Sequence, residues 1–382
     1  MGYFANFKKS FKFKYCANYL IIAVFLVLAV VLRDAGLLSR SAVGLFTRIS
    51  YSIILAVSLN LIVGFLGELS LGHAGFMCVG AYIGCLCANL LHSYISSNLL
   101  VLILAMLIGG LSAAVFGLII GLPALRLKGD YLAIVTLAFG EIVRNICKNV
   151  DIFGGAKGLS TVKYPANSLF VVAFIVVILV LFLIQNLIRS KHGRAITAIR
   201  DNEIAAKAMG INVTFYKLLV FVIAAFFAGI AGVLYGHYTT PILPSFFSYN
   251  YSIEILVMVV LGGMGSINGS ILAATLITYI NFTLQNKLSG DLAALKYLIY
   301  AIILILMVLF NNAPVFRPLR ENLSLKKLWA RLTAHRSKPE NIKDDDAAWN
   351  RIDTKIKMDE LLSVDLQKND AYTPDQPKKG DH

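Results

Sequence analysis

Four ionisable side chains stand inside or beside long apolar runs of this sequence: Glu68, His73, Glu141 and Glu254. If those runs cross a membrane, each charge is costly there, so such residues are candidates for a transport pathway or a proton relay. Glu141 can pair with Arg144 one helical turn later, and Glu254 can snorkel towards the outer surface. No chain of acidic residues forms the relay that a proton-driven pump needs, which counts against an ion-coupled pump.

Metal, cofactor and nucleotide chemistry find no support in the sequence. The five cysteines lie within or at the edges of apolar runs, without a C-x-x-C pair or a histidine at ligand spacing. No G-x-x-x-x-G-K-[ST] phosphate loop occurs in the sequence. We therefore expect no metal site, no cofactor and no disulfide framework, and a chain that is not an enzyme and does not itself hydrolyse ATP.

Two glycine-rich stretches lie between apolar runs, the first glycine segment (residues 64–75) and the second glycine segment (residues 262–270). Both contain G-x-x-G, then an apolar residue two places later, then a small polar residue. Paired breaks in corresponding halves are typical of discontinuous helices whose freed backbone groups line a pathway. Two tight turns without substrate contact are the alternative. The candidate pathway residues are Asn60, Ser70, Gly72, His73, Gly75, Gly262, Gly263, Gly265 and Asn268.

A polar segment, residues 200–210, separates two apolar runs and has the features of a short helix. Asp201 or Asn202 can cap its first amides, and Glu203 complements the positive end of the helix dipole. Gly210 can adopt the left-handed conformation that ends a helix. We predict one helix of about two turns, roughly 12 Å long. Such a helix is either an ordinary solvated loop helix or a knob that docks in a groove of another protein.

The composition identifies the class of protein. Hydrophobic residues make up 58% of the 382 residues, charged residues 15%, and the mean hydropathy is +0.74, so charges are too few to cover a soluble globule. We predict an all-α polytopic bundle of membrane helices. The net charge of +14 could suggest nucleic-acid binding, but Lys and Arg lie at the ends of apolar runs and in both tails, a distribution typical of membrane topology.

The apolar runs predict about ten membrane segments, most of them near the ~20 residues that a bilayer requires. The first run follows a basic stretch but lacks a small-residue cleavage site, so we predict an uncleaved helix. Stripes of small residues, such as Gly109, Ala113, Gly117 and Gly121, predict close helix packing. The segments are residues 15–32, 49–66, 74–91, 99–121, 129–147, 168–188, 218–238, 251–265, 269–286 and 293–311.

Basic residues predict the topology and the domain organisation. More Lys and Arg lie near segment ends on the side of the N-terminus than on the other side, which predicts that both termini and the polar segment 200–210 are cytoplasmic. The sequence divides into a basic tail (residues 1–14), a membrane domain (residues 15–312) and a largely disordered cytoplasmic tail (residues 313–382).

Several motifs, in this order, resemble those of the permease subunits of branched-chain amino-acid ABC importers, and among them the LivM-like branch. They include Leu69-Ser70-Leu71-Gly72-His73-Ala74-Gly75-Phe76, Leu125-Arg126-Leu127-Lys128-Gly129-Asp130 and Gly154-Gly155-Ala156-Lys157-Gly158-Leu159. The resemblance covers residues 20–312, and further matching motifs within that range lie at residues 193–211 and 262–266. It implies a permease in the bacterial inner membrane that moves leucine, isoleucine and valine.

The resemblance also implies partners and a coupling helix. The partners are a second permease subunit, cytoplasmic ATP-binding subunits and a periplasmic substrate-binding protein. Importers of this class carry an E-A-A-x-x-x-G loop that couples to the ATPase, and here Ile204 is inserted after the glutamate, while the apolar-Pro ending of that loop is absent. The coupling candidates are Arg200, Asp201, Asn202, Glu203, Ala205, Ala206 and Gly210.

Two alternatives to this function remain open. A related permease for urea, short amides or sugars would share the same scaffold. A secondary transporter with inverted repeats, driven by an ion gradient, belongs to a different class, and activity without an ATPase partner would distinguish it.

Overall fold

The computed structural model describes residues 39–287, except 128 and 163, and the single residues 30, 301, 302 and 305. The chain divides into two compact units, Met1–Asn312 and Ala313–His382, and every described residue belongs to the first. The long helices are α3 (Arg40–Asn60), α4 (His73–Leu91), α5 (Asn98–Ala124), α6 (Asp130–Asn149), α7 (Ala166–Arg189), α10 (Val213–Tyr238) and α12 (Ile267–Lys287). The shorter elements are the π-helix η1 (Leu61–Leu66), the 3-10 helices η2 (Asp151–Phe153), η3 (Gly155–Lys157) and η4 (Pro244–Phe247), and α8 (Lys191–Asp201), α9 (Glu203–Ala208) and α11 (Tyr249–Gly262).

The described part of the chain is a bundle of helices, as predicted, and contains no strand beyond an isolated bridge between Leu159 and Ile242. Within the described residues, six stretches are long and apolar enough to cross a membrane: Ser41–Leu66, His73–Leu91, Asn98–Ala124, Ser168–Arg189, Val213–Tyr238 and Ile267–Gln285. The predicted segments 15–32 and 293–311 and both tails lie outside the described residues, apart from positions 30, 301, 302 and 305.

Two predicted segments begin earlier than the apolar pattern indicated. The segment predicted from residue 49 begins at residue 40, where Ser39 Oγ accepts a hydrogen bond from Ala42 N at 3.3 Å. The segment predicted from residue 218 begins at residue 213, where Asn212 Oδ1 accepts from Phe215 N at 3.1 Å. In both places a capping side chain begins the helix before the hydrophobic run does, so hydropathy alone sets the start too late.

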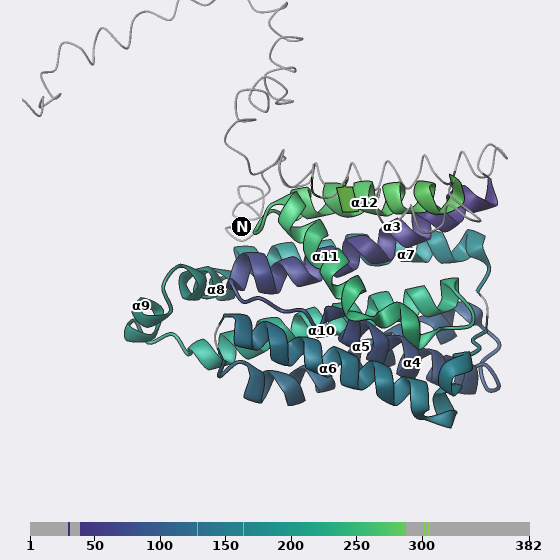
Figure 1. Cartoon of the computed structure of the whole chain (residues 1–382), viewed down its shortest axis with the longest axis horizontal. Helices are drawn as coiled ribbons and strands as arrows, with labels where there is room; N and C mark the ends of the chain where they lie inside the picture. The colour runs from purple at the N-terminus through teal and green to yellow at the C-terminus, as the bar shows by residue number, and fades with distance from the viewer. Residues whose placement is uncertain are drawn as a thin grey trace, which may run out of the picture. The chain divides into compact units, whose positions relative to one another are not determined.

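Helices α4, α5 and α10 form the most closely packed group, and α10 contacts both of the others extensively (Figure 1). Glycines permit this approach. A Cβ on Gly80 of α4 would overlap the backbone of Gly229 of α10, and a Cβ on Gly109 of α5 would lie 2.8 Å from the carbonyl oxygen of Gly80. The small-residue stripes therefore pack helices backbone to backbone, as predicted from their spacing.

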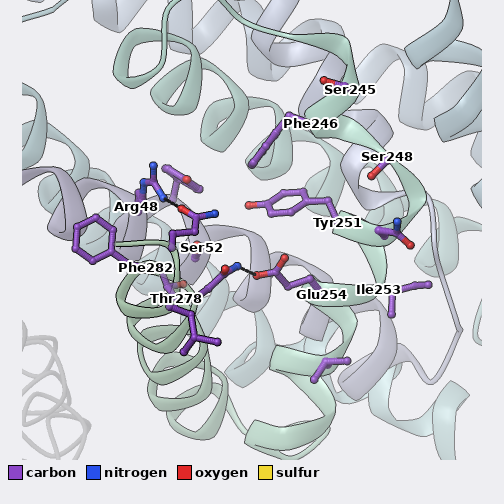
Figure 2. A pocket seen from close by; sticks show the side chains of 16 residues that line it. Arg48, Ser52, Ser245, Phe246, Ser248, Tyr251, Ile253, Glu254, Thr278 and Phe282 are labelled. Carbon is purple, nitrogen blue, oxygen red and sulfur yellow. Dashed lines mark hydrogen bonds between the residues drawn. The ribbon is translucent and has the colours of Figure 1, made fainter. Parts of the chain in front are cut away.

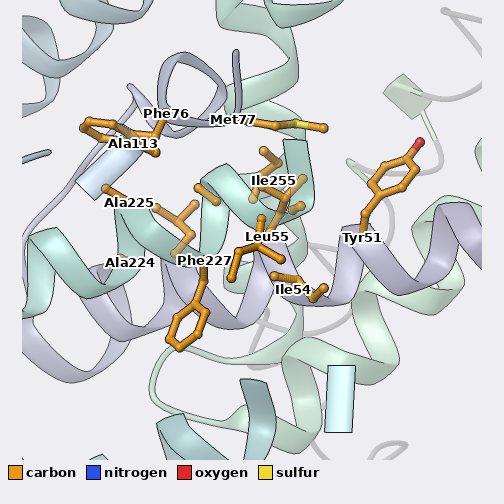
Figure 3. Close-up of a cluster of buried hydrophobic side chains, with 14 of the residues drawn as sticks. Tyr51, Ile54, Leu55, Phe76, Met77, Ala113, Ala224, Ala225, Phe227 and Ile255 are labelled. Atoms are coloured by element: carbon orange, nitrogen blue, oxygen red, sulfur yellow. The ribbon is translucent and has the colours of Figure 1, made fainter. Parts of the chain in front are cut away.

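Helix α3 lies alongside α7, α10, α11 and α12 (Figure 1). In its middle, at Arg48, Tyr51 and Ser52, α3 borders a cavity that α11 and α12 also line (Figure 2). Directly afterwards, Ile54 and Leu55 are buried in the hydrophobic core beside residues of α4, α10 and α11, such as Met77, Phe227 and Ile255 (Figure 3).

We predict that Gly80→Val destabilises the bundle. The added side chain would have to displace the backbone of α10 rather than a flexible side chain, and overpacking of this kind costs at least about 1–3 kcal/mol. Thermal unfolding of the purified chain in detergent should show a transition lowered by several degrees. Ala138→Val adds a similar volume at an exposed position of α6 and is the control; equal stability of the two variants would contradict the packing argument.

Candidate functional site

Helices α8 and α9 lie at one end of the bundle, beyond the ends of the long helices (Figure 1). Ser190 Oγ accepts hydrogen bonds from His192 N and Gly193 N at the start of α8. Asn202 is extended, with φ −158° and ψ 105°, and its Oδ1 accepts from Ile204 N at 3.1 Å and Ala205 N at 3.0 Å. Asn202 therefore ends α8 and caps α9.

This break corrects the prediction of a single helix over residues 200–210. Arg200 and Asp201 form the last turn of α8, a helix that the sequence analysis did not predict, and α9 spans only Glu203–Ala208. The C-terminal prediction is confirmed, because Gly210 has φ +81°. Gly210 N donates to Lys207 O at 3.0 Å and Ile211 N to Ala206 O at 3.1 Å, the two hydrogen bonds of a Schellman ending.

Arg200 joins α8 to the first glycine segment. Its Nη1 donates to the carbonyl oxygen of Gly64 at 3.1 Å, and its Nε and Nη2 donate to Asp201 Oδ1 at 3.0 and 2.8 Å. The stem of Arg200 covers Gly67, where a Cβ would lie 2.7 Å from Arg200 Cγ and where φ is +82°. Gly67 thus allows the chain both to turn and to approach Arg200.

Lys217 of α10 joins α9 to the same segment. Its Nζ lies 2.5 Å from Glu68 Oε1 and 3.3 Å from Glu203 Oε2, and its side chain is only 4% exposed. A buried ammonium needs such carboxylate partners, because removing one leaves an uncompensated charge. Glu68 and Glu203 had been predicted for separate roles, and a partner for either of them among the basic residues had not been predicted. A lysine five residues into an apolar helix was the available signal.

The two glycine segments meet through Asn60, which is fully buried. Its Oδ1 accepts from Gly265 N at 2.9 Å, and its Nδ2 donates to Ser266 O at 3.1 Å and to Ser270 Oγ at 2.9 Å. Gly64 is needed beside this contact, because a Cβ there would overlap Gly265 N. The structure therefore brings together Asn60 and Gly265, which the sequence analysis had placed in the same candidate pathway.

The two segments nevertheless differ in structure. Gly262 ends α11, Gly263 and Gly265 have φ +90° and +79°, and residues 263–266 form a tight turn before α12. Ser266 Oγ accepts from Gly269 N at 3.2 Å in the first turn of α12. Asn268 is exposed. The second glycine segment thus matches the alternative of a tight turn.

The first glycine segment returns into the bundle without helical structure at residues 67–72. His73 Nε2 lies 2.8 Å from Ser58 Oγ, and Ser58 is eight residues, or about 12 Å along the helix, before Leu66. Non-helical backbone at this depth requires partners within the protein. Thr136 and Ser252 supply two of them: Leu71 N donates to Thr136 Oγ1 and Ala74 N to Ser252 Oγ, both at 3.1 Å.

The remaining predicted pathway residues are enclosed. Ser70 and His73 are fully buried, and Ser70 Oγ and His73 Nδ1 have no hydrogen-bond partner within the described part of the chain. Gly72 and Gly75 pack against α6, where a Cβ on Gly72 would overlap Thr136 O and a Cβ on Gly75 would lie 2.6 Å from Gly140 Cα. In this conformation the segment is closed by packing.

The other ionisable candidates lie away from this end. The predicted pair of Glu141 with Arg144 is confirmed, with Nε–Oε2 at 2.8 Å, and Glu141 Oε1 also accepts from Tyr249 N at 3.0 Å. Glu254 Oε1 accepts from Asn281 Nδ2 at 3.0 Å. Among the described residues, no group of three or more His, Cys, Asp or Glu side chains could hold a metal ion, and Cys78, Cys85, Cys87 and Cys147 are free thiols.

Comparison with known proteins gives a family match over most of the chain. Residues 41–308 match the family model described as "Branched-chain amino acid transport system / permease component". No solved structure matches the chain.

The chain is similar in sequence to three curated permease proteins. The chain is 36% identical to the high-affinity branched-chain amino acid transport system permease protein LivM of Salmonella typhimurium, over 76% of this chain and 73% of the relative. It is 36% identical to the protein of the same name from Escherichia coli, over 79% and 77%. The probable branched-chain amino acid transport permease protein LivM of Methanocaldococcus jannaschii is 32% identical over 56% and 73%. The chain therefore belongs to the family of permease components of branched-chain amino acid transport systems.

Proposed function

We propose that this chain is the membrane-spanning permease subunit of an ABC importer that moves leucine, isoleucine and valine across the bacterial inner membrane, with ATP hydrolysed by a separate subunit. The observation that carries the coupling part of this proposal is the α8–α9 segment (residues 191–208), a short helical pair fixed to the first glycine segment by Arg200 and Lys217. The names of the relatives support the cargo.

Helix α9 has the surface of a docking element. Ile204 is 80% exposed and Met209 is 83% exposed, although both side chains are apolar, while Ala206 on the same helix is buried against the bundle. Exposed apolar side chains on a short, capped helix fit a groove of a partner protein. In our proposal that partner is a cytoplasmic ATP-binding subunit, and Glu203, Ala205 and Gly210 belong to the coupling loop.

Transmission would proceed through the contacts that hold α9. When the ATP-binding subunits close, α9 and α8 move as a unit, because Asn202 and the Schellman ending define both helix ends. Arg200 and Lys217 then carry the displacement to Gly64 and Glu68. The first glycine segment can respond because residues 67–72 form no helix of their own, although Gly67 N and Glu68 N still donate to Ile62 O at the end of η1.

The proposal includes the rest of the importer. This chain would contribute about ten membrane segments and a pathway lined by its glycine-interrupted helices, and a second permease subunit would pair with it as a heterodimer. A periplasmic binding protein would deliver the amino acid to the outer face. Both termini of this chain would be cytoplasmic. Exposed apolar side chains along α5, such as Leu111, Val115 and Leu122, suit contact with lipid or with the second permease.

The test of the proposed function is uptake by membrane vesicles that contain the complete importer. We expect uptake of labelled leucine to require ATP and the binding protein, and to exceed uptake of urea or ribose. Transport of urea or ribose in place of leucine would favour the related permeases. Leucine uptake driven by an ion gradient, in vesicles without the ATP-binding subunits, would contradict the proposal.

We predict that Ile204→Asp weakens docking without destabilising the bundle. The side chain is 80% exposed, so the charge enters water in the isolated chain but an apolar groove in the complex. Co-purification of the ATP-binding subunits should fall sharply, while the thermal unfolding transition stays unchanged. Leu127→Asp, at an exposed apolar position of the α5–α6 connection, is the control; an equal loss with this control would argue against a specific role of α9.

We also predict that Glu203→Lys abolishes uptake while membrane insertion is retained. The substitution places a second cation beside Lys217, which Glu203 contacts at 3.3 Å, and so repels α9 from the bundle. Uptake should fall more than about tenfold, which corresponds to a coupling loss above about 1.4 kcal/mol. Asp151→Lys reverses an exposed acidic residue of η2 and is the control. Normal uptake by Glu203→Lys would remove Glu203 from the coupling contact.

A further inference from the structure

Helices α4 and α6 pack side by side along a line of contacts that we call the α4–α6 seam, between residues 72–82 and residues 136–153 (Figure 1). Near the start of the seam, a Cβ on Gly75 would lie 2.6 Å from Gly140 Cα, so the two backbones touch there. At its other end, the rings of Tyr82 and Phe153 meet edge to face, with their centroids 5.5 Å apart. The first glycine segment leads directly into α4, so the seam holds the end of that segment against α6.

Two thiols meet inside the seam. Cys78 Sγ lies 3.8 Å from Cys147 Sγ, and Cys78 is the donor of the hydrogen bond between them. The two residues are 0% and 4% exposed. Cys78 lies five residues after the start of α4, and Cys147 lies two residues before the end of α6. A covalent bond between the two sulfurs requires them to approach by less than about 2 Å.

Packing alone does not explain this pair. A single buried cysteine behaves as a small apolar side chain, and either thiol could fill its place on α4 or α6 without the other. Within the described part of the chain, no other cysteine contacts a second thiol; Cys85 Sγ, also on α4, lies 4.0 Å from the carbonyl oxygen of Val233. Two thiols in contact on different helices are the arrangement that disulfide chemistry requires.

The geometry gives the two sulfurs different roles. Because Cys78 donates the hydrogen bond, a negative charge on the sulfur of Cys147 already has a donor from which to accept. Cys147 lies in the last turn of α6, one turn after Arg144, whose side chain is 27% exposed. Reactive cysteines lie beside such cations and close to water. Cys147 is therefore the attacking thiol, and Cys78 is the thiol that resolves the product.

We propose that Cys78 and Cys147 form a redox modification site, which hydrogen peroxide closes into a disulfide that ties α4 to α6. The deprotonated sulfur of Cys147 attacks one oxygen of the peroxide, the O–O bond breaks, and a sulfenic acid forms while hydroxide leaves and takes up the proton of the thiol. Cys78 then attacks the sulfur of the sulfenic acid, and the oxygen leaves as water with the proton of Cys78. Two thiols are oxidised to one disulfide, and one peroxide is reduced to two water molecules.

The disulfide stops transport, a consequence that rests on the proposed function. Cys78 lies only about 8 Å along α4 from His73, where the first glycine segment meets the helix. The contacts of that segment with α6 are noncovalent, such as the hydrogen bond from Leu71 N to Thr136 Oγ1 at 3.1 Å, and can part when the segment moves. A covalent tie beside them cannot part, so the oxidised chain keeps its fold but holds the segment against α6.

The site is tested by mass spectrometry of the full chain in lipid nanodiscs, treated with hydrogen peroxide, then denatured and alkylated. We expect two fewer of the five cysteines to be alkylated after oxidation, and a linked peptide that contains Cys78 and Cys147. Cys78→Ala and Cys147→Ala should each lack the linked peptide. Cys85→Ala removes another buried thiol of α4, should retain the linked peptide, and is the matched control. Thermal unfolding checks that each variant is folded.

Two results would show that the pair is not such a site. One is that both thiols remain open to alkylation after peroxide treatment. The other is that either sulfur gains two or three oxygens while no linked peptide forms, because a resolving thiol in contact would have trapped the sulfenic acid first.

ATP-dependent leucine uptake by the complete importer tests the consequence. Oxidation should lower uptake at least about tenfold in wild type and in Cys85→Ala, because one state of the moving segment is trapped, and dithiothreitol should restore it. Cys78→Ala and Cys147→Ala should keep their uptake after oxidation. A linked peptide with unchanged uptake, or an equal loss in Cys78→Ala, overturns the locking role. An absence of ATP-dependent uptake by untreated wild type overturns the proposed function, whereas the linked peptide still decides whether the two thiols are a modification site.

Discussion

The packing of α8, α9 and the first glycine segment against the bundle depends on the burial of one ammonium group. Lys217 is 4% exposed and lies between Glu68 of the first glycine segment and Glu203 of α9. An isolated ammonium there would cost several kcal/mol, so α10 holds both carboxylates close to itself. Arg200 adds a second connection, to the backbone of Gly64. As a result, neither α8 nor α9 can move far from the bundle without moving the first glycine segment.

Helix α3 extends this constraint to the other end of the molecule. Its middle is fixed in the core by Ile54 and Leu55, which are 1% and 0% exposed (Figure 3). It continues into the π-helix η1, a geometry often found at functional positions, and Arg200 contacts the carbonyl oxygen of Gly64 within η1. Because a packed helix moves as a rigid unit, a displacement of the backbone at Gly64 would also displace Arg48, which lines the cavity.

Local features of the sequence predicted the structure well, and long-range ones did not. The Asn202 cap, the left-handed Gly210 and the pair of Glu141 with Arg144 each involve residues within four positions, where helix geometry determines the neighbours. The pair of Lys217 with Glu68 joins residues 149 positions apart, and no periodicity records such a contact. Charged residues near segment ends were interpreted as topology signals, so the pairing of Lys217 with Glu68 and Glu203 was missed.

The difference between the two glycine segments follows from where each one lies. The second can be a short turn because Asn60 and Ser266 satisfy its amides at the end of the bundle. The first enters the interior, where water cannot replace missing hydrogen bonds, so α6 and α11 must supply Thr136 and Ser252. Displacing the first segment therefore disturbs α6 and α11 together. Since α11 also carries Glu254, two helices join the first glycine segment to the cavity: α3 carries Arg48 and precedes η1, and α11 carries both Ser252 and Glu254.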